Sequence, residues 1–201
     1  METQAEGSEN QMELPFRPAL AAHTPSIRER FAWGAMPPQP LGAEDVGRAC
    51  FDLAVGFDSS YSRLIEQLRQ SDRALENLDF SAVWTELLCL GFFAVQHALT
   101  VSLHTEKLHG VLQAYHGQLK LLRMSGVFDF FEIVTSRSLV YSAALDLPSA
   151  ALSGRIGEIF AGLAGRRNHS QLIGIGASLF EHIDADVRRW IAEIGEANIV
   201  I

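Results

Sequence analysis

The chain has 201 residues, 48% hydrophobic and 20% charged, which is enough for one globular domain with a sizeable core. Its formal net charge of −8 disfavours nucleic acid as a partner, and it carries no basic run suited to anionic lipid. The first residues are acidic and polar, unlike a secretory signal. Two distant cysteines, Cys50 and Cys89, predict buried free thiols in a reducing cytoplasm.

Residues 1–41 differ in composition from the rest of the chain. Six of the seven prolines lie there, and proline excludes a continuous helix because it lacks the amide donor. A short helix over residues 25–33 remains possible. Aromatic residues are rare in disordered tails, so we expect a partly ordered arm that docks on its own domain or on a second protein. The residues expected to dock are Phe16, Phe31, Trp33 and Met36.

From residue 42 onward, apolar residues recur at three- and four-residue spacing, which predicts one helix after another. The first two cover residues 43–57 and 61–78. No stretch shows sustained alternation of apolar and polar residues, so no strand is predicted, and the final EANIVI is interpreted as a short apolar tail.

Residues 81–103 are the most apolar stretch, with apolar side chains around the whole helical circumference. Such a helix is typical of a protein interior. It is slightly short for a bilayer and carries Gln96 and His97 at its middle, so we interpret it as a buried central helix and not as a membrane span. Ser81 is the predicted N-cap, with Glu86 among the acidic residues near the helix start.

Four more helices are predicted over residues 105–124, 127–145, 149–166 and 171–194. In the first of these, Gly110 and Gly117 lie seven residues apart and share a face that a neighbouring helix could approach closely. In residues 127–145 the predicted buried stripe consists of Phe128, Phe131, Val134, Thr135, Leu139 and Ser142. The sequence therefore predicts an all-α, single-domain bundle of about seven helices over residues 42–201, built around residues 81–103.

Histidines in the middle of the chain are the first candidates for a metal site. His97 and His104 lie seven residues apart, as do His109 and His116, which places each pair roughly 10 Å apart along a helix. Bonds of about 2 Å cannot join both members of such a pair to one ion. A site formed across helices, for example by Glu86, His97 and a residue from elsewhere, is the remaining alternative. No Gly-x-Ser-x-Gly elbow or phosphate loop occurs either, so we predict no metal, no cofactor and no catalytic residue.

Two arginines lie among apolar residues. Arg137 and Arg155 are expected to pair with Glu132 or Glu158 across helices, or to bind an anionic ligand.

Several stretches resemble a pattern found in uncharacterised all-helical bacterial proteins. They are the apolar helix from residue 87, HGVLQAYHGQL, FEIVTSRSLVYSAAL, RIGEIFAGLAG and SQLIGIGASLFEHI. The resemblance covers about half of the chain, implies a helical fold and brings no known activity. LGFFAVQHAL and GVFDFFEI are also similar to helical-bundle regulators of apoptosis, whose Asn-Trp-Gly-Arg signature this chain lacks.

Two hypotheses of function follow. The first is a non-catalytic helical interaction protein of the cytoplasm, such as an adaptor, an accessory subunit or a regulator, which binds another protein or a second copy of itself. The alternative is a helical protein that binds a small molecule or cofactor in a pocket beside the central helix. That pocket would be lined by Phe92, Phe93, His97, His104 and Arg137.

Overall fold

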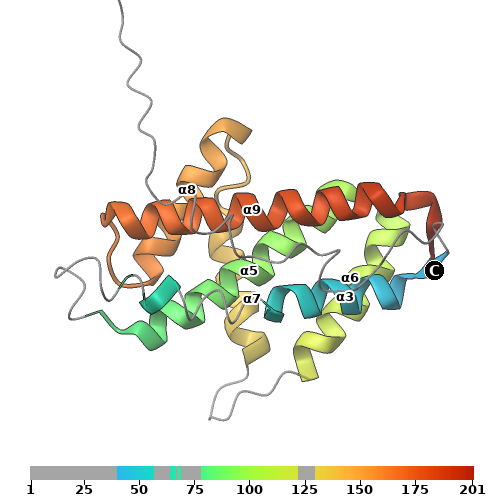
Figure 1. Ribbon diagram of the computed structural model, residues 1–201, viewed down its shortest axis with the longest axis horizontal. Coiled ribbons are helices and arrows are strands. Elements are labelled where there is room, and N and C mark those ends of the chain that lie inside the picture. The colour runs from blue at the N-terminus through green and yellow to red at the C-terminus, as the bar shows by residue number, and fades with distance from the viewer. Residues whose placement is uncertain (1–39, 57–63, 67, 69–77, 122–129) are drawn as a thin grey trace, which may run out of the picture.

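The computed structural model describes residues 40–56, 64–66, 68, 78–121 and 130–201 (Figure 1). These residues form an all-α, single-domain bundle, as predicted. Its helices are α3 (Ala43–Gly56), α5 (Phe80–Ser102), α6 (Thr105–Leu121), α7 (Phe130–Ser142), α8 (Ser149–Leu163) and α9 (Ser170–Ile194), followed by the 3-10 turn η2 (Glu196–Asn198). The helix expected over residues 25–33, and most of the one expected over residues 61–78, lie outside the described residues.

Helix α5 is the centre of the bundle. It contacts α9, α7, α3, α6 and α8, and 13 of its 23 residues are buried, which confirms the prediction of a central helix (Figure 1). By length and composition α5 could also cross a membrane, but 72% of its most apolar 18-residue window is covered by the rest of the bundle. Core helices of soluble proteins also pass this test of length and composition.

The N-cap of α5 is Asp79, and the prediction of Ser81 was wrong. The Asp79 carboxylate accepts hydrogen bonds from the amides of Ser81 and Ala82, at 2.9 and 3.2 Å. Its negative charge also lies at the positive end of the helix dipole, an advantage that a serine hydroxyl lacks.

The last residues of the chain form a short strand that the sequence did not predict. Leu41–Gly42 (β1) pairs in parallel with Ile199–Val200 (β2), with Leu41 opposite Ile199. Two residues per strand are too few to produce a pattern of alternating side chains, which explains the missed prediction. The pair joins the start of α3 to the end of α9 (Figure 1).

Glycine permits close approach in two of the helix pairs. A Cβ atom added to Gly47 of α3 would lie 2.5 Å from the carbonyl oxygen of Val111 in α6. A Cβ on Gly157 of α8 would collide with the backbone of Ile173 in α9, so these helices pack with backbone against backbone. The glycine pair predicted in α6 behaves differently, because Gly110 lies close to Ala43 whereas a Cβ on Gly117 would meet nothing within 4 Å.

Helix α7 buries a different stripe from the predicted one. Its buried residues are Phe130, Val134 and Tyr141, while Leu139 is 73% exposed. Leu139 precedes Tyr141 by two residues, or about 200° around a helix, so the two side chains point in nearly opposite directions. Burial of Tyr141 therefore turns Leu139 and its neighbour Val140 toward solvent.

Candidate functional site

Phe92 lies inside the core and lines no open space. Its ring centroid is 5.9 Å from that of Phe51, 6.0 Å from that of Tyr115 and 5.9 Å from that of Phe130. The Tyr115 hydroxyl donates a hydrogen bond of 3.0 Å to the Phe92 carbonyl. Three rings and a hydrogen bond thus fill the space around this residue.

His97 belongs to a partly buried group between α5 and α9. Its Nδ1 is 2.8 Å from Asp184 Oδ1, and Asp184 Oδ2 is 2.8 Å from Arg188 Nε in an ion pair. The ring of Phe93 stacks on the imidazole at 6.3 Å between centroids, and the ring of Phe180 is tilted against it at 5.4 Å. An aspartate and the histidine that it orients are two of the three members of a hydrolytic triad, but these contacts bring no hydroxyl or thiol to the ring within the described part of the chain.

His104 is separated from the other predicted ligand-binding residues. Its backbone amide and its Nδ1 both bind the Glu196 carboxylate, each at 2.6 Å. These hydrogen bonds, the backbone one first, lower the pKa of Glu196. Lys107 adds a hydrogen bond to the Glu196 carbonyl, so the group fastens η2 to the junction of α5 and α6.

Arg137 forms a buried ion pair with Glu86, and neither of its expected partners, Glu132 and Glu158, is the one found. Arg137 Nε donates to Glu86 Oε1 at 2.6 Å. Glu86 is 2% exposed, although the sequence analysis placed it with the acidic residues at the helix start. A single acid on a helix that is apolar all round has to be buried, and this signal in the sequence could have identified it as the partner of a buried cation.

Burial controls the titration of the groups around this pair. It raises the pKa of Glu86, against the opposing hydrogen bond and charge of Arg137. Burial also raises the pKa of Cys89 to about 12 and that of Tyr141 well above its ordinary value. A protonated thiol is a poor nucleophile, and Cys50 is buried in the same way, so both cysteines are the inert thiols that were predicted.

The residues predicted to line one ligand pocket therefore lie in four separate environments. Phe92 is enclosed by rings, Phe93 and His97 lie together beside α9, Arg137 is paired with Glu86, and His104 is bound to Glu196. Within the described ranges no group of three or more His, Cys, Asp or Glu side chains could hold a metal ion.

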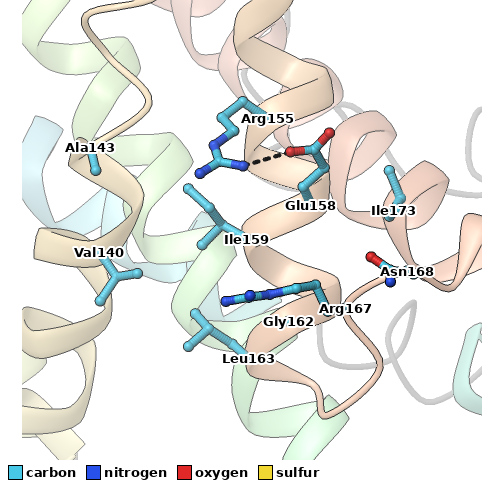
Figure 2. A pocket seen from close by; sticks show the side chains of 10 residues that line it. All are labelled: Val140, Ala143, Arg155, Glu158, Ile159, Gly162, Leu163, Arg167, Asn168 and Ile173. Carbon is cyan, nitrogen blue, oxygen red and sulfur yellow. Dashed lines mark hydrogen bonds and ion pairs between the residues drawn. The ribbon is translucent and has the colours of Figure 1, made fainter.

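A groove opens where α7, α8 and the start of α9 meet (Figure 2). It has a volume of about 610 Å³ and combines apolar walls with two arginines and an amide. Arg167 extends along the wall formed by Ile159 and Leu163, and Arg155 Nη1 is held by Glu158 at 2.7 Å (Figure 2). The groove is lined by Val140, Ala143, Arg155, Glu158, Ile159, Gly162, Leu163, Arg167, Asn168 and Ile173.

Exposed apolar side chains are concentrated in the stretch of chain that contributes Val140 and Ala143 to this groove. The described residues contain eight large hydrophobic side chains that are exposed, and four of them lie within residues 139–147. They are Leu139, Val140, Leu145 and Leu147. We call these four residues together with the groove the docking face. Isolated apolar residues are normal on a surface, whereas a cluster beside a groove is typical of a binding site.

This face was not predicted, because Leu139 was expected in the buried stripe of its helix and is exposed instead. The two possible buried stripes of this helix are both apolar, so the sequence offered no signal that would have placed Leu139 at the surface. The predicted partner-binding residues Phe16, Phe31, Trp33 and Met36 lie outside the described residues.

No family model, curated protein or solved structure matches this chain.

Proposed function

We propose that this protein is a non-catalytic helical interaction module whose partner binds the docking face. The observation that carries the proposal is the concentration of exposed leucine and valine side chains on residues 139–147, a stretch whose Val140 and Ala143 line a groove with apolar walls. Covering such side chains contributes about 25 cal/mol for each Å² of apolar surface removed from water. The partner is another protein or a second copy of this chain, as the sequence analysis expected.

Two further observations favour an interaction module over the alternative of a ligand pocket beside the central helix. Phe92 and Phe93 pack against other rings, so other side chains fill the space next to these two residues. Four charged or polar side chains of this region form pairs within the chain, Glu86 with Arg137 and His97 with Asp184. These contacts account for their presence without a ligand.

The proposal is tested by capturing partners from the source cell with the full-length protein and two variants. Leu139→Glu places a charge on the docking face, and Leu121→Glu places the same charge at an equally exposed leucine at the end of α6 (73% and 74% exposed). We expect a stoichiometric partner, or a second copy of the chain, to be retained by the wild type and by Leu121→Glu and lost by Leu139→Glu. Equal retention by the two variants, or no stoichiometric partner with the wild type, would contradict the proposal.

A further inference from the structure

The docking face lies beside cationic side chains that no acid neutralises. Among the basic side chains of the described residues, Arg166 and Arg167 have no hydrogen bond, ion pair or ring contact. Arg48, Arg137, Arg155, Arg188 and Arg189 each have a carboxylate partner, Lys107 binds a carbonyl, and Lys120 lies over a ring. The chain has a net charge of −8, so two neighbouring guanidinium groups without an acidic partner are unusual on its surface.

The groove is therefore suited to an occupant of one chemical class. Its walls, with Val140, Ile159 and Leu163, are suited to apolar side chains, and Arg167 presents a charge along the same wall (Figure 2). Arg155 also remains available, because its pair with Glu158 is solvent-exposed and such pairs contribute little. The matching occupant is a segment that carries both carboxylates and large apolar side chains.

This chain contains such a segment. Residues 1–16 include four glutamates and neither lysine nor arginine, and three large apolar residues lie within residues 12–16. The glutamates are Glu2, Glu6, Glu9 and Glu13, and the apolar residues are Met12, Leu14 and Phe16.

The segment can also reach the groove. Residues 17–40 join it to β1, which lies beside β2 at the end of α9, whereas Ile173 of the groove is near the start of α9. The distance along α9 from Ile173 to Ile194 is about 30 Å. An extended chain of 24 residues spans up to ~80 Å, so the connection is more than long enough.

We propose that residues 9–16 of this chain bind in the groove of their own molecule, with their glutamates at Arg167 and Arg155 and their apolar side chains against α7 and α8. The proposal deepens the proposed function and rests on it, because the arm then covers part of the docking face until a partner displaces it. Tethering supplies an effective concentration in the millimolar range, so a weak contact is sufficient.

Disulfide trapping in the full-length chain tests this proposal. Met12→Cys is combined with Val140→Cys in the groove wall or, as a control, with Leu121→Cys on α6. The native thiols are buried and do not compete. Under mild oxidation we expect Met12→Cys to form an intramolecular disulfide with Val140→Cys at least about tenfold faster than with Leu121→Cys, because only the groove holds the segment.

Charge variants test the electrostatic part. Arg167→Glu is expected to slow trapping about tenfold, whereas Arg189→Glu, an equally drastic change on exposed α9 surface, should leave the rate unchanged. Equal trapping at Val140→Cys and Leu121→Cys, or no effect of Arg167→Glu, would overturn the proposal. Disulfide-linked dimers in place of linked monomers would also overturn it and would identify a second copy as the occupant.

Disulfide trapping and partner capture can fail independently of each other. If trapping fails while Leu139→Glu still loses a partner that Leu121→Glu retains, the arm proposal falls and the docking face remains. If Leu139→Glu retains the partner while trapping at Val140→Cys succeeds, the groove serves only the arm.

Discussion

The core around α5 and the docking face contain the same kinds of side chain, but these are paired or packed in the core and unpaired or exposed on the docking face. In the core the guanidinium of Arg137 is bound to Glu86, and the ring of Phe93 is stacked on Tyr141. On the docking face Arg167 has no acidic partner, and Leu139 is exposed to water. Side chains that have partners within the chain stabilise the fold. Side chains that have no such partner are available to bind another molecule.

The largest expected effect comes from breaking the buried pair. Arg137→Leu leaves Glu86 buried without its cation and should lower the free energy of unfolding at pH 7 by about 3 kcal/mol. Glu86→Leu should cost less, because the Arg137 side chain is 34% exposed and can turn toward water. The double variant should recover most of the loss, since no unpaired charge remains inside.

Urea unfolding of the two single variants and the double variant, read by circular dichroism, checks this prediction. Equal losses in the two single variants, or a double variant that is as unstable as Arg137→Leu, would show that Glu86 is not the group whose burial matters.

The next largest effect concerns the contact between α8 and α9. Gly157→Ala should destabilise the protein by about 2 kcal/mol, because the new methyl group meets the backbone of α9 and neither helix can move independently. Gly154 lies in the same helix with nothing within 4 Å, so Gly154→Ala should stabilise by about 1 kcal/mol through helix propensity alone. Thermal or urea unfolding distinguishes them, and effects of the same sign would contradict the close packing of the two helices.

A smaller effect is expected from the titration of Glu86. Burial raises its pKa in the folded protein above the ordinary value, so the folded state holds this proton more tightly than the unfolded chain does. The resulting stabilisation is complete below the ordinary glutamate pKa and is lost as the pH rises through the raised value. Relative to Glu86→Gln, which has no proton to lose, the wild type should therefore become less stable as the pH rises from about 4 toward neutrality.

Urea unfolding of the wild type and Glu86→Gln at several pH values in this range measures the difference. A wild type that gains stability over Glu86→Gln as the pH rises would mean that Arg137 outweighs burial and lowers the pKa of this carboxyl.

The sequence predicted the helices well because their signals are local. The apolar circumference of residues 81–103 identified α5, and Gly195, with φ of 75°, ends α9 as expected for a glycine after a helix. Pairings between distant residues left weaker signals. Nothing near Arg137 in the sequence points to Glu86, which lies 51 residues earlier, and the two-residue strands are too short for any pattern.

The docking face could not be predicted because it depends on the rotation of α7. A shift of the buried stripe from Phe131 and Leu139 to Phe130 and Tyr141 is enough to move Leu139 from the core to the surface. Both stripes are apolar, so composition does not distinguish them, and only packing against α5 decides between them.

The smallest expected effect on stability is at the docking face itself. Leu139→Glu should change the free energy of unfolding by less than about 0.5 kcal/mol, because the side chain is already exposed in the folded protein. Val134→Glu, on the buried side of the same helix, provides the contrast and should be severely destabilising. A large loss of stability in Leu139→Glu would show that this leucine is part of the core.

Footprinting of the full-length protein with and without its captured partner tests the central claim most directly. Side-chain labelling, read by mass spectrometry, reports the exposure of individual leucines. The account predicts that labelling of Leu139, Leu145 and Leu147 falls severalfold in the complex while that of Leu121 stays the same. Unchanged labelling of residues 139–147 together with protection of another surface would contradict the claim that the partner binds the docking face.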